Sequence, residues 1–105
     1  MPREGTVRRG VRGLLKGLGV PFYPIPGNVY SKRGSPDFVA CIMGRFLGIE
    51  CKRPKGGESS PKISPSQRRE AKLVKRHLGY HVFAHRVEDV KKKLKEIEDD
   101  VKGQS

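Results

Sequence analysis

Three charged residues stand within a short, otherwise apolar stretch of the chain, GSPDFVACIMGRFLGIECK, residues 34–52. Asp37 precedes the first apolar run, and Glu50 and Lys52 close the second. Carboxylate oxygens are the ligands that Mg²⁺ prefers, and a bound Mg²⁺ acidifies water and stabilises charge on a reacting phosphate. A lysine ammonium beside them can orient the nucleophile or neutralise the phosphate. The residue types therefore fit metal-assisted phosphodiester hydrolysis, although charged residues at strand ends are also common as plain solvated groups.

The two apolar runs predict a β-hairpin that brings the three charged residues to one face. With Gly44 and Arg45 as a two-residue mirror-image turn, Asp37 lies opposite Lys52, and Glu50 is its diagonal neighbour on the same face. The opposite face carries apolar residues and predicts a core face: Phe38, Ala40, Ile42, Leu47, Ile49 and Cys51. A turn with an odd number of residues would instead send Asp37 to that other face.

The segments around the hairpin predict a small α/β domain with a mixed β-sheet flanked by helices. Apolar residues at helical spacing, together with a helix start at Ser64-Pro65 and Gly79 as a stop, predict three helices: residues 6–18, 65–78 and 87–101. The segment VPFYPIPGN, residues 20–28, contains three prolines and predicts an extended edge segment or loop. YHVFAH, residues 80–85, predicts a further strand. The expected order is helix, three strands, helix, strand and helix, within one domain that spans residues 1–105.

Several short motifs in and beyond the hairpin resemble one superfamily of nucleases. Pro36-Asp37, followed after a hairpin by Glu50-Cys51-Lys52, is similar to the PD-(D/E)XK signature. The stretches GSPDF, IECK, SPSQ and GYHVFAHRVEDV are similar to its virus-type replication and repair nuclease group, VRR-NUC. This resemblance covers nearly the whole chain. It implies a restriction-endonuclease-like core and a Mg²⁺- or Mn²⁺-dependent endonuclease activity on DNA, with no small-molecule cofactor.

The resemblance also assigns roles to the residues of the hairpin. It implies that Asp37 and Glu50 bind the metal ion and that Lys52 positions the attacking water or the phosphate. It adds the main-chain carbonyl of Cys51 as a further metal ligand. These four positions match the motif of the group residue by residue.

Two further residues enter the site only through the resemblance, and each has a structural alternative. Glu4 corresponds to a metal-binding glutamate on the first helix, but an acidic residue there also favours the positive end of the helix dipole. Gln67 corresponds to a catalytic-site glutamine on the helix after the core motif. It also completes a capping box with Ser64, in which the third helical residue bonds back to the cap.

The charge of the chain suits a polyanionic partner. Lys and Arg total 23 against 11 Asp and Glu, a formal net charge of +12. Such a charge attracts phosphate backbones irrespective of their sequence. The basic residues that we assign to DNA cluster before or after the metal motif: Arg8, Arg9, Arg12, Lys32, Arg33, Arg53, Lys55, Arg68, Arg69 and Lys72. Solubilising surface charge is the alternative for each of them.

The remaining features predict an intracellular protein, in the cytoplasm or nucleoid of the host cell, without a membrane partner. No segment is apolar enough to span a bilayer, and the N-terminal stretch MPREGTVRRG lacks the apolar core of a signal peptide. The two cysteines, Cys41 and Cys51, do not amount to a secreted disulfide framework, and the hairpin register places them on opposite faces.

Three histidines, His77, His81 and His85, recur every four residues. Zinc-binding helices use this interval, but the predicted helix ends between the first two of them, and no carboxylate or cysteine lies nearby. Surface or DNA-facing groups are therefore favoured over a zinc site.

The resemblance bears on the DNA substrate as well. Stand-alone members of the group resolve four-way junctions as dimers, whereas larger eukaryotic relatives act on flaps and in crosslink repair as monomers. The length of the chain favours the first type, and symmetrical incision of two strands needs the two sites of a twofold homodimer. A flap or nicking endonuclease with the same metal site is one alternative, and a non-enzymatic basic module that binds DNA by shape is another.

Overall fold

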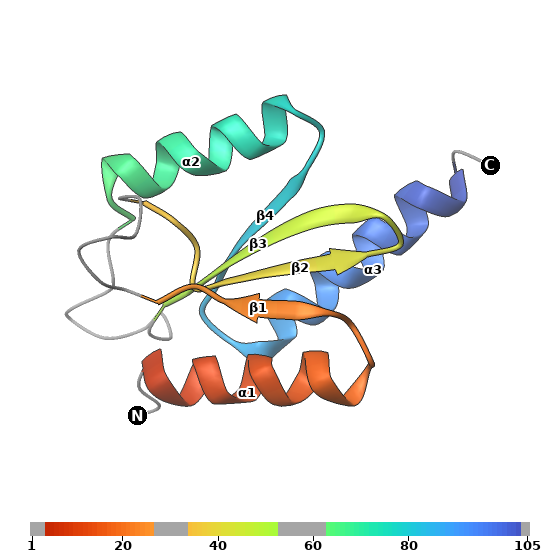
Figure 1. Cartoon of the computed structure of the whole chain (residues 1–105), viewed down its shortest axis with the longest axis horizontal. Coiled ribbons are helices and arrows are strands. Elements are labelled where there is room, and N and C mark those ends of the chain that lie inside the picture. The colour runs from red at the N-terminus through yellow and green to blue at the C-terminus, as the bar shows by residue number, and fades with distance from the viewer. Residues whose placement is uncertain (1–3, 27–33, 53–62, 104–105) are drawn as a thin grey trace.

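The computed structural model describes residues 4–26, 34–52 and 63–103, apart from the side chain of Glu4. These residues form an α/β fold in which three helices flank a four-stranded mixed sheet (Figure 1). The elements in chain order are α1 (Glu4–Gly17), β1 (Phe22–Pro24), β2 (Phe38–Ile42), β3 (Arg45–Cys51), α2 (Pro65–Arg76), β4 (Tyr80–Ala84) and α3 (Val87–Gly103). The predicted α/β class, mixed sheet and element order are confirmed.

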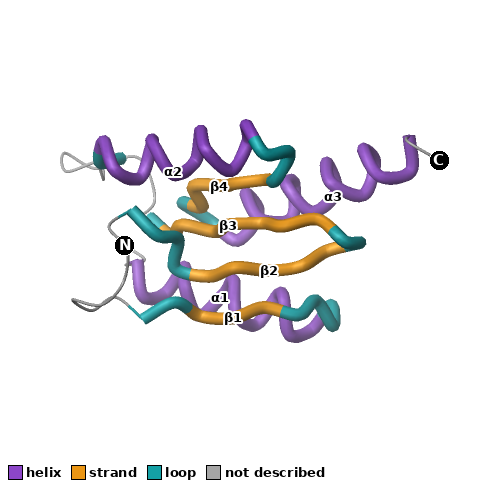
Figure 2. Tube along the Cα trace, turned by 45° about the horizontal axis from the view of Figure 1, so that its top comes forward, coloured by secondary structure: helices purple, strands orange, loops and turns teal. Residues whose placement is uncertain are grey.

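The strands lie in the sheet in their order along the chain, β1-β2-β3-β4. β1 and β3 each pair antiparallel with β2, whereas β4 runs parallel to β3 because the chain crosses over through α2 between them. One face of the sheet is covered by α2, and the other by α1 and α3 (Figures 1 and 2). The end of β3 therefore lies between helices on both faces.

The hydrophobic core fills the space between the sheet and the pair α1 and α3. The helical spacing predicted for the first helix is confirmed, since Val7, Val11 and Leu15 are buried there. Its predicted last residue, Leu18, lies outside α1 and is 59% exposed. The predicted core face of the hairpin is buried at five positions: Phe38, Ala40, Leu47, Ile49 and Cys51.

The hairpin turn lies one residue earlier than predicted. Met43 and Gly44 form it, with φ angles of 50° and 80°, the positive values that a mirror-image turn requires. The observed register aligns Asp37, directly before β2, with Glu50 rather than with Lys52. Because the predicted and the observed turn both contain two residues, the error leaves every side chain on its predicted face.

Helix α2 begins as predicted and ends differently. The Ser64 side chain accepts a hydrogen bond from the Gln67 N–H, the Gln67 side chain accepts one from the Ser64 N–H, and Pro65 is the first helical residue. At the other end, Leu78 rather than Gly79 has a left-handed conformation, with φ of 65°. The N–H groups of both residues bond back to carbonyls of the last turn, the pattern of a Schellman motif.

Leu73 and Leu78, apolar residues of the predicted second helix, are 43% and 84% exposed. The buried side chain of α2 is Ala71. Gly79 follows the helix for a steric reason, since a Cβ atom there would lie 2.8 Å from Val74 Cγ1.

Both cysteines are free, with Cys41 exposed and Cys51 buried, as their placement on opposite faces predicts. In the part of the chain that the structure describes, every helix lacks the length or the apolar character that crossing a bilayer requires.

Candidate active site

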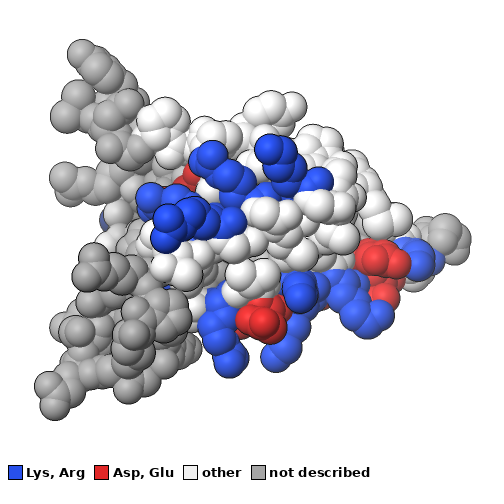
Figure 3. Space-filling view, turned by 90° about the horizontal axis from the view of Figure 1, so that it is seen from below, with Lys and Arg blue, Asp and Glu red and all other residues white. Residues whose placement is uncertain are grey.

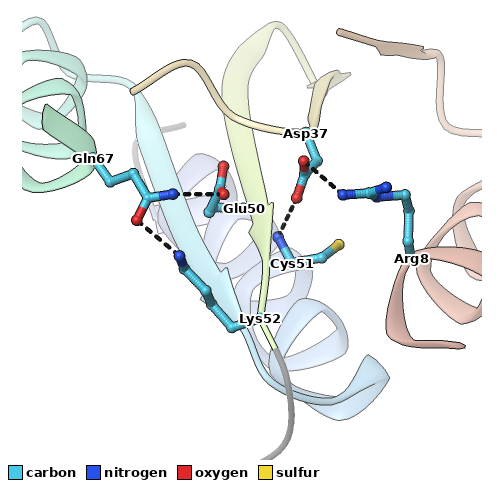
Figure 4. A network of polar contacts seen from close by, with 6 residues as sticks. All are labelled: Arg8, Asp37, Glu50, Cys51, Lys52 and Gln67. Carbon is cyan, nitrogen blue, oxygen red and sulfur yellow. Dashed lines mark hydrogen bonds and ion pairs between the residues drawn. The ribbon is translucent and has the colours of Figure 1, made fainter. Parts of the chain in front are cut away.

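Polar side chains and one main-chain N–H group, from four parts of the fold, meet where β3 ends (Figure 4). They come from α1, from the segment before β2, from the end of β3 with the residue that follows, and from the first turn of α2: Arg8, Asp37, Glu50, Cys51, Lys52 and Gln67. The predicted catalytic residues Asp37, Glu50, Lys52 and Gln67 are thus brought together by the fold.

Asp37 is held by main-chain contacts on two sides. Its carbonyl oxygen accepts a hydrogen bond of 2.8 Å from the N–H of Ile25, and its Oδ2 accepts one of 2.8 Å from the N–H of Cys51. The approach to Asp37 also needs a glycine. A Cβ atom at Gly34, which has a φ of 86°, would lie 2.5 Å from the carbonyl oxygen of Ser66. The glycine of the GSPD motif therefore lets this segment pass close to the start of α2.

Arg8 forms an ion pair with Asp37 that the sequence did not predict. Its Nη2 lies 3.1 Å from Asp37 Oδ1, and the two side chains are 45% and 20% exposed. The sequence assigned Arg8 to DNA alone. One feature of the sequence could have indicated this contact. Residues one turn apart on a helix lie on the same face, so a Glu4 side chain in the site would place Arg8 near the site as well. The guanidinium offsets part of the negative charge of the carboxylate.

Glu50 is a buried carboxylate, 6% exposed, on the face of the sheet that α2 covers. Its Oε1 accepts a hydrogen bond of 2.8 Å from Gln67 Nε2. Its Oε2 is buried as well and accepts no hydrogen bond from the described residues. Glu50 lies between Gln67 and Asp37 in the site (Figure 4). Burial is costly for a charged group unless it is paired, so a carboxylate in this position favours a cation nearby.

Lys52 is also buried, with an exposed fraction of 8%. Its N–H donates a hydrogen bond of 2.8 Å to the carbonyl oxygen of Ala84, which continues the pairing of β3 with β4. Its Nζ donates one of 2.8 Å to Gln67 Oε1. The ammonium is therefore directed into the site rather than into solvent.

Gln67 connects these groups and also completes the predicted capping box. Its Oε1 accepts hydrogen bonds from Lys52 Nζ and, at 3.0 Å, from the N–H of Ser64, while its Nε2 donates to Glu50. The reverse orientation of the amide would place its NH₂ group against two donors and its oxygen against a carboxylate. The capping box and the site thus require the same orientation of this side chain.

The oxygen donors at this place fit a divalent cation such as Mg²⁺ or Mn²⁺. Asp37 and Glu50 are aligned across β2 and β3, and Mg²⁺ typically uses one or two carboxylates and keeps several waters. No group of three or more His, Cys, Asp or Glu side chains that could hold a metal ion occurs in the described ranges. Glu4 is the first residue of α1, but its side chain is not described. Cys51 contacts Asp37 through its N–H, and the predicted role of its carbonyl oxygen stays a prediction.

The predicted DNA-binding residues are divided between two helices and the undescribed segments. On α1, Arg9 and Arg12 are exposed, and the Arg12 guanidinium carbon lies 5.8 Å from the ring centre of Phe38. Three lie exposed on α2: Arg68, Arg69 and Lys72. Four lie outside the described residues: Lys32, Arg33, Arg53 and Lys55. Seen from the side of α1, Lys and Arg gather over this helix, whereas over α3 they alternate with Asp and Glu (Figure 3).

The chain matches no family model, and no curated protein sequence matches it. The chemical interpretation of the site therefore depends on its own residues and geometry.

Proposed function

We propose that the protein is a Mg²⁺- or Mn²⁺-dependent endonuclease that hydrolyses phosphodiester bonds in branched DNA. The observation that carries this proposal is the network at the end of β3. It joins the Glu50 carboxylate and the ammonium of the buried Lys52 through Gln67, while the Asp37 carboxylate bonds to the N–H of Cys51, the residue between them in the chain. These are the groups that metal-assisted cleavage of a phosphodiester needs.

Each residue of the proposed site has a distinct role. A divalent cation, when bound, supplies positive charge for the phosphate and a water of lowered pKa. Asp37 and Glu50 hold it. Lys52 keeps its ammonium within the site, where it donates a hydrogen bond to the attacking water or to a phosphate oxygen. Gln67 holds both Lys52 and Glu50 in place, and Arg8 supplies a further positive charge beside Asp37.

The fold supports the resemblance to the PD-(D/E)XK superfamily and its VRR-NUC group. The element order agrees with the expected order α-β-β-β-α-β-α, and the motif residues lie at the end of the central strand pair β2 and β3. The core motif also lies against the SPSQ helix start, through Gln67 and through Gly34. We infer that the fold is the restriction-endonuclease-like core of this superfamily.

Four-way junctions are the substrate that we favour, with the protein acting as a homodimer. The net charge of +12 and the basic surface over α1 favour a substrate that presents several phosphate backbones at once (Figure 3). Two symmetric cuts in opposing strands require two sites, which a twofold dimer provides.

The proposal is tested with a labelled immobile four-way junction, a 5′ flap and a linear duplex, each incubated with Mg²⁺, with Mn²⁺ and with EDTA. We expect paired cuts in opposing strands of the junction with either metal and none with EDTA. Asp37→Asn keeps the size of the side chain but removes its charge, and we expect it to slow cleavage at least about 100-fold. Asp99→Asn is the matched control, because it makes the same change on the exposed surface of α3.

The other outcomes separate the alternatives. Cleavage of the flap alone, still lost in Asp37→Asn, would keep the metal site and reject junction resolution. Tight binding of the junction without metal-dependent cleavage would favour the non-enzymatic basic module. Full activity of Asp37→Asn would contradict the proposed site itself.

A further inference from the structure

Two adjoining hollows lie along the outer edge of β4. This is the edge of the sheet opposite the one near β2 and Asp37. β4 is a terminal strand of the described sheet. One hollow, of about 680 Å³, extends along β4 to the start of α3, and the other, of about 790 Å³, lies between the hairpin turn, the end of α2 and α3. His81 and Lys93 line both. We call the two hollows together the β4-edge groove; its lining includes Arg45, Lys75, His81, Arg86, Lys92 and Lys93.

The groove is basic, and the acidic side chains in its lining have positive or N–H partners. Among the described residues, five Lys and Arg side chains line it against Asp89 and Glu96. Glu96 Oε2 lies 2.6 Å from Lys93 Nζ. Asp89 Oδ2 accepts hydrogen bonds from the main-chain N–H groups of His85 and Arg86, at 2.9 and 3.2 Å. A concave surface lined by charge of one sign concentrates its field, so the groove attracts anions.

His81 adds a buried polar group where the two hollows meet. It is 5% exposed, its ring lies 4.7 Å from that of Phe83, and a Cβ atom at Gly48 would lie 3.1 Å from its Cδ2. Its Nδ1 is buried without a hydrogen-bond partner among the described residues. Burial and Lys75 lower the pKa of His81 to about 4, with Lys93 acting in the same direction and Glu70 against it. The imidazole is therefore neutral at pH 7 and carries one N–H, which can donate to an anion.

We propose that the β4-edge groove binds a second segment of the nucleic-acid phosphodiester backbone, separate from the segment that is cut. Lys75 and Arg45 contact phosphates at one end of it, Arg86 and Lys92 at the other, and Lys93, which lines both hollows, between them. The His81 imidazole donates a hydrogen bond between them. This inference rests on the proposed function for the identity of the polyanion, and it adds a place on the protein for the part of the DNA that is not hydrolysed.

The Arg45 end of the groove lies away from the catalytic residues, whereas Phe83, which lines its other end, pairs with Glu50. Arg45 and Glu50 are the first and sixth residues of β3, which places them about 17 Å apart at a rise of ~3.3 Å per residue. One strand of a duplex carries a phosphate every ~3.4 Å along the axis, so that distance corresponds to about five nucleotides. The Arg45 end of the groove and the catalytic residues therefore cannot hold the same phosphate. A neighbouring arm of a branched molecule would supply the second backbone.

A second copy of the chain is the competing occupant, because an open strand edge can pair with another strand. Lysines along an edge oppose such pairing, since two copies of the groove would bring like charges together. The charge of the groove thus favours a polyanion over self-association.

The experiment compares two double variants of the full chain in EDTA, where cleavage does not occur. Lys75→Gln/Lys93→Gln removes two charges from the groove, and Lys95→Gln/Lys102→Gln removes two from the ion-paired outer surface of α3. Fluorescence anisotropy gives the affinity for a labelled four-way junction and a short linear duplex over a series of salt concentrations. We expect the groove variant to bind the junction about tenfold more weakly, and its slope of log K against log salt to fall by about two. The short duplex and the control variant should change much less.

The outcomes distinguish this inference from the proposed function. Equal junction binding by the groove and control variants would overturn the proposed role of the groove. It would not bear on the proposed nuclease activity, since cleavage is measured separately with metal. A shift in sedimentation of the groove variant without DNA would also overturn the proposed role of the groove and identify the groove as a protein interface. Weaker junction binding by the groove variant, together with no cleavage by the wild type, would support the proposed role of the groove and reject the proposed nuclease activity. Side-chain NMR gives a second readout: addition of the junction should shift the imidazole resonances of His81, and unshifted resonances would count against the proposal.

Discussion

Gln67 is the residue on which local structure and chemistry depend together. Its side chain bonds to the N–H of Ser64, to the Lys52 ammonium and to the Glu50 carboxylate. The first bond stabilises the start of α2, and the other two hold the buried charged groups of the candidate site. A substitution at Gln67 therefore changes helix stability and site geometry at once, whereas a substitution at Ser64 can change the first alone.

This difference gives a prediction at the scale of single residues. Ser64→Ala removes the cap and should lower the free energy of unfolding by about 1 kcal/mol, with junction cleavage close to wild type. Gln67→Ala should destabilise the fold at least as much and also lower cleavage, because Lys52 and Glu50 lose their shared partner. Urea unfolding and single-turnover cleavage measure the two effects. Equal cleavage by both variants would show that Gln67 acts as a cap only.

The sequence predicted the members of the site better than their contacts. Asp37, Glu50 and Lys52 could be found because their types and spacing carry a chemical motif, whereas Gln67 entered through the resemblance alone. The Arg8–Asp37 ion pair could not, since it joins residues 29 positions apart and depends on where α1 lies against the sheet. Burial of a side chain follows from such packing rather than from the residue itself.

At the scale of elements, the apolar spacing and the Ser64-Pro65 start sufficed to place helices and strands within a few residues. The turns were less predictable. Met43 occupies the left-handed position before Gly44, and methionine carries no preference that would indicate it. The end of α2 was misplaced for the same reason, because Leu78 rather than a glycine has the positive φ.

Leu78 also gives a prediction at this scale. A residue with a Cβ atom is strained at positive φ. The Leu78 side chain is 84% exposed, so its removal costs little buried apolar surface. Leu78→Gly should raise the free energy of unfolding by about 1 kcal/mol, seen as a melting temperature higher by roughly 4 °C. Gly79→Ala should do the opposite, because its Cβ would lie 2.8 Å from Val74 Cγ1. A loss of stability in Leu78→Gly would indicate that Leu78 is covered in solution.

For the whole molecule, the buried histidine of β4 predicts how stability depends on pH. Burial and Lys75 lower the pKa of His81 to about 4 from 6.5, so the unfolded chain binds a proton more readily than the folded one. The contribution of His81 to the free energy of unfolding is therefore fully present above about pH 6.5 and is lost as the pH falls toward 4. The loss is at most about 2 to 3 kcal/mol. Urea unfolding across this range should show a smaller decline in His81→Asn than in the wild type. His85→Asn should keep the wild-type decline, and identical pH profiles of all three proteins would contradict the assignment.

The way α2 is attached to the rest of the fold has a further consequence for how the protein unfolds. Ala71 is the buried side chain of this helix, so α2 contributes little to the core and is suited to detach before the rest of the fold opens. Gln67 leaves with it, and Lys52 and Glu50 then lose their shared partner. The candidate site would therefore disassemble in a partial opening below the temperature of global unfolding, with amide hydrogen exchange in α2 faster than in β3.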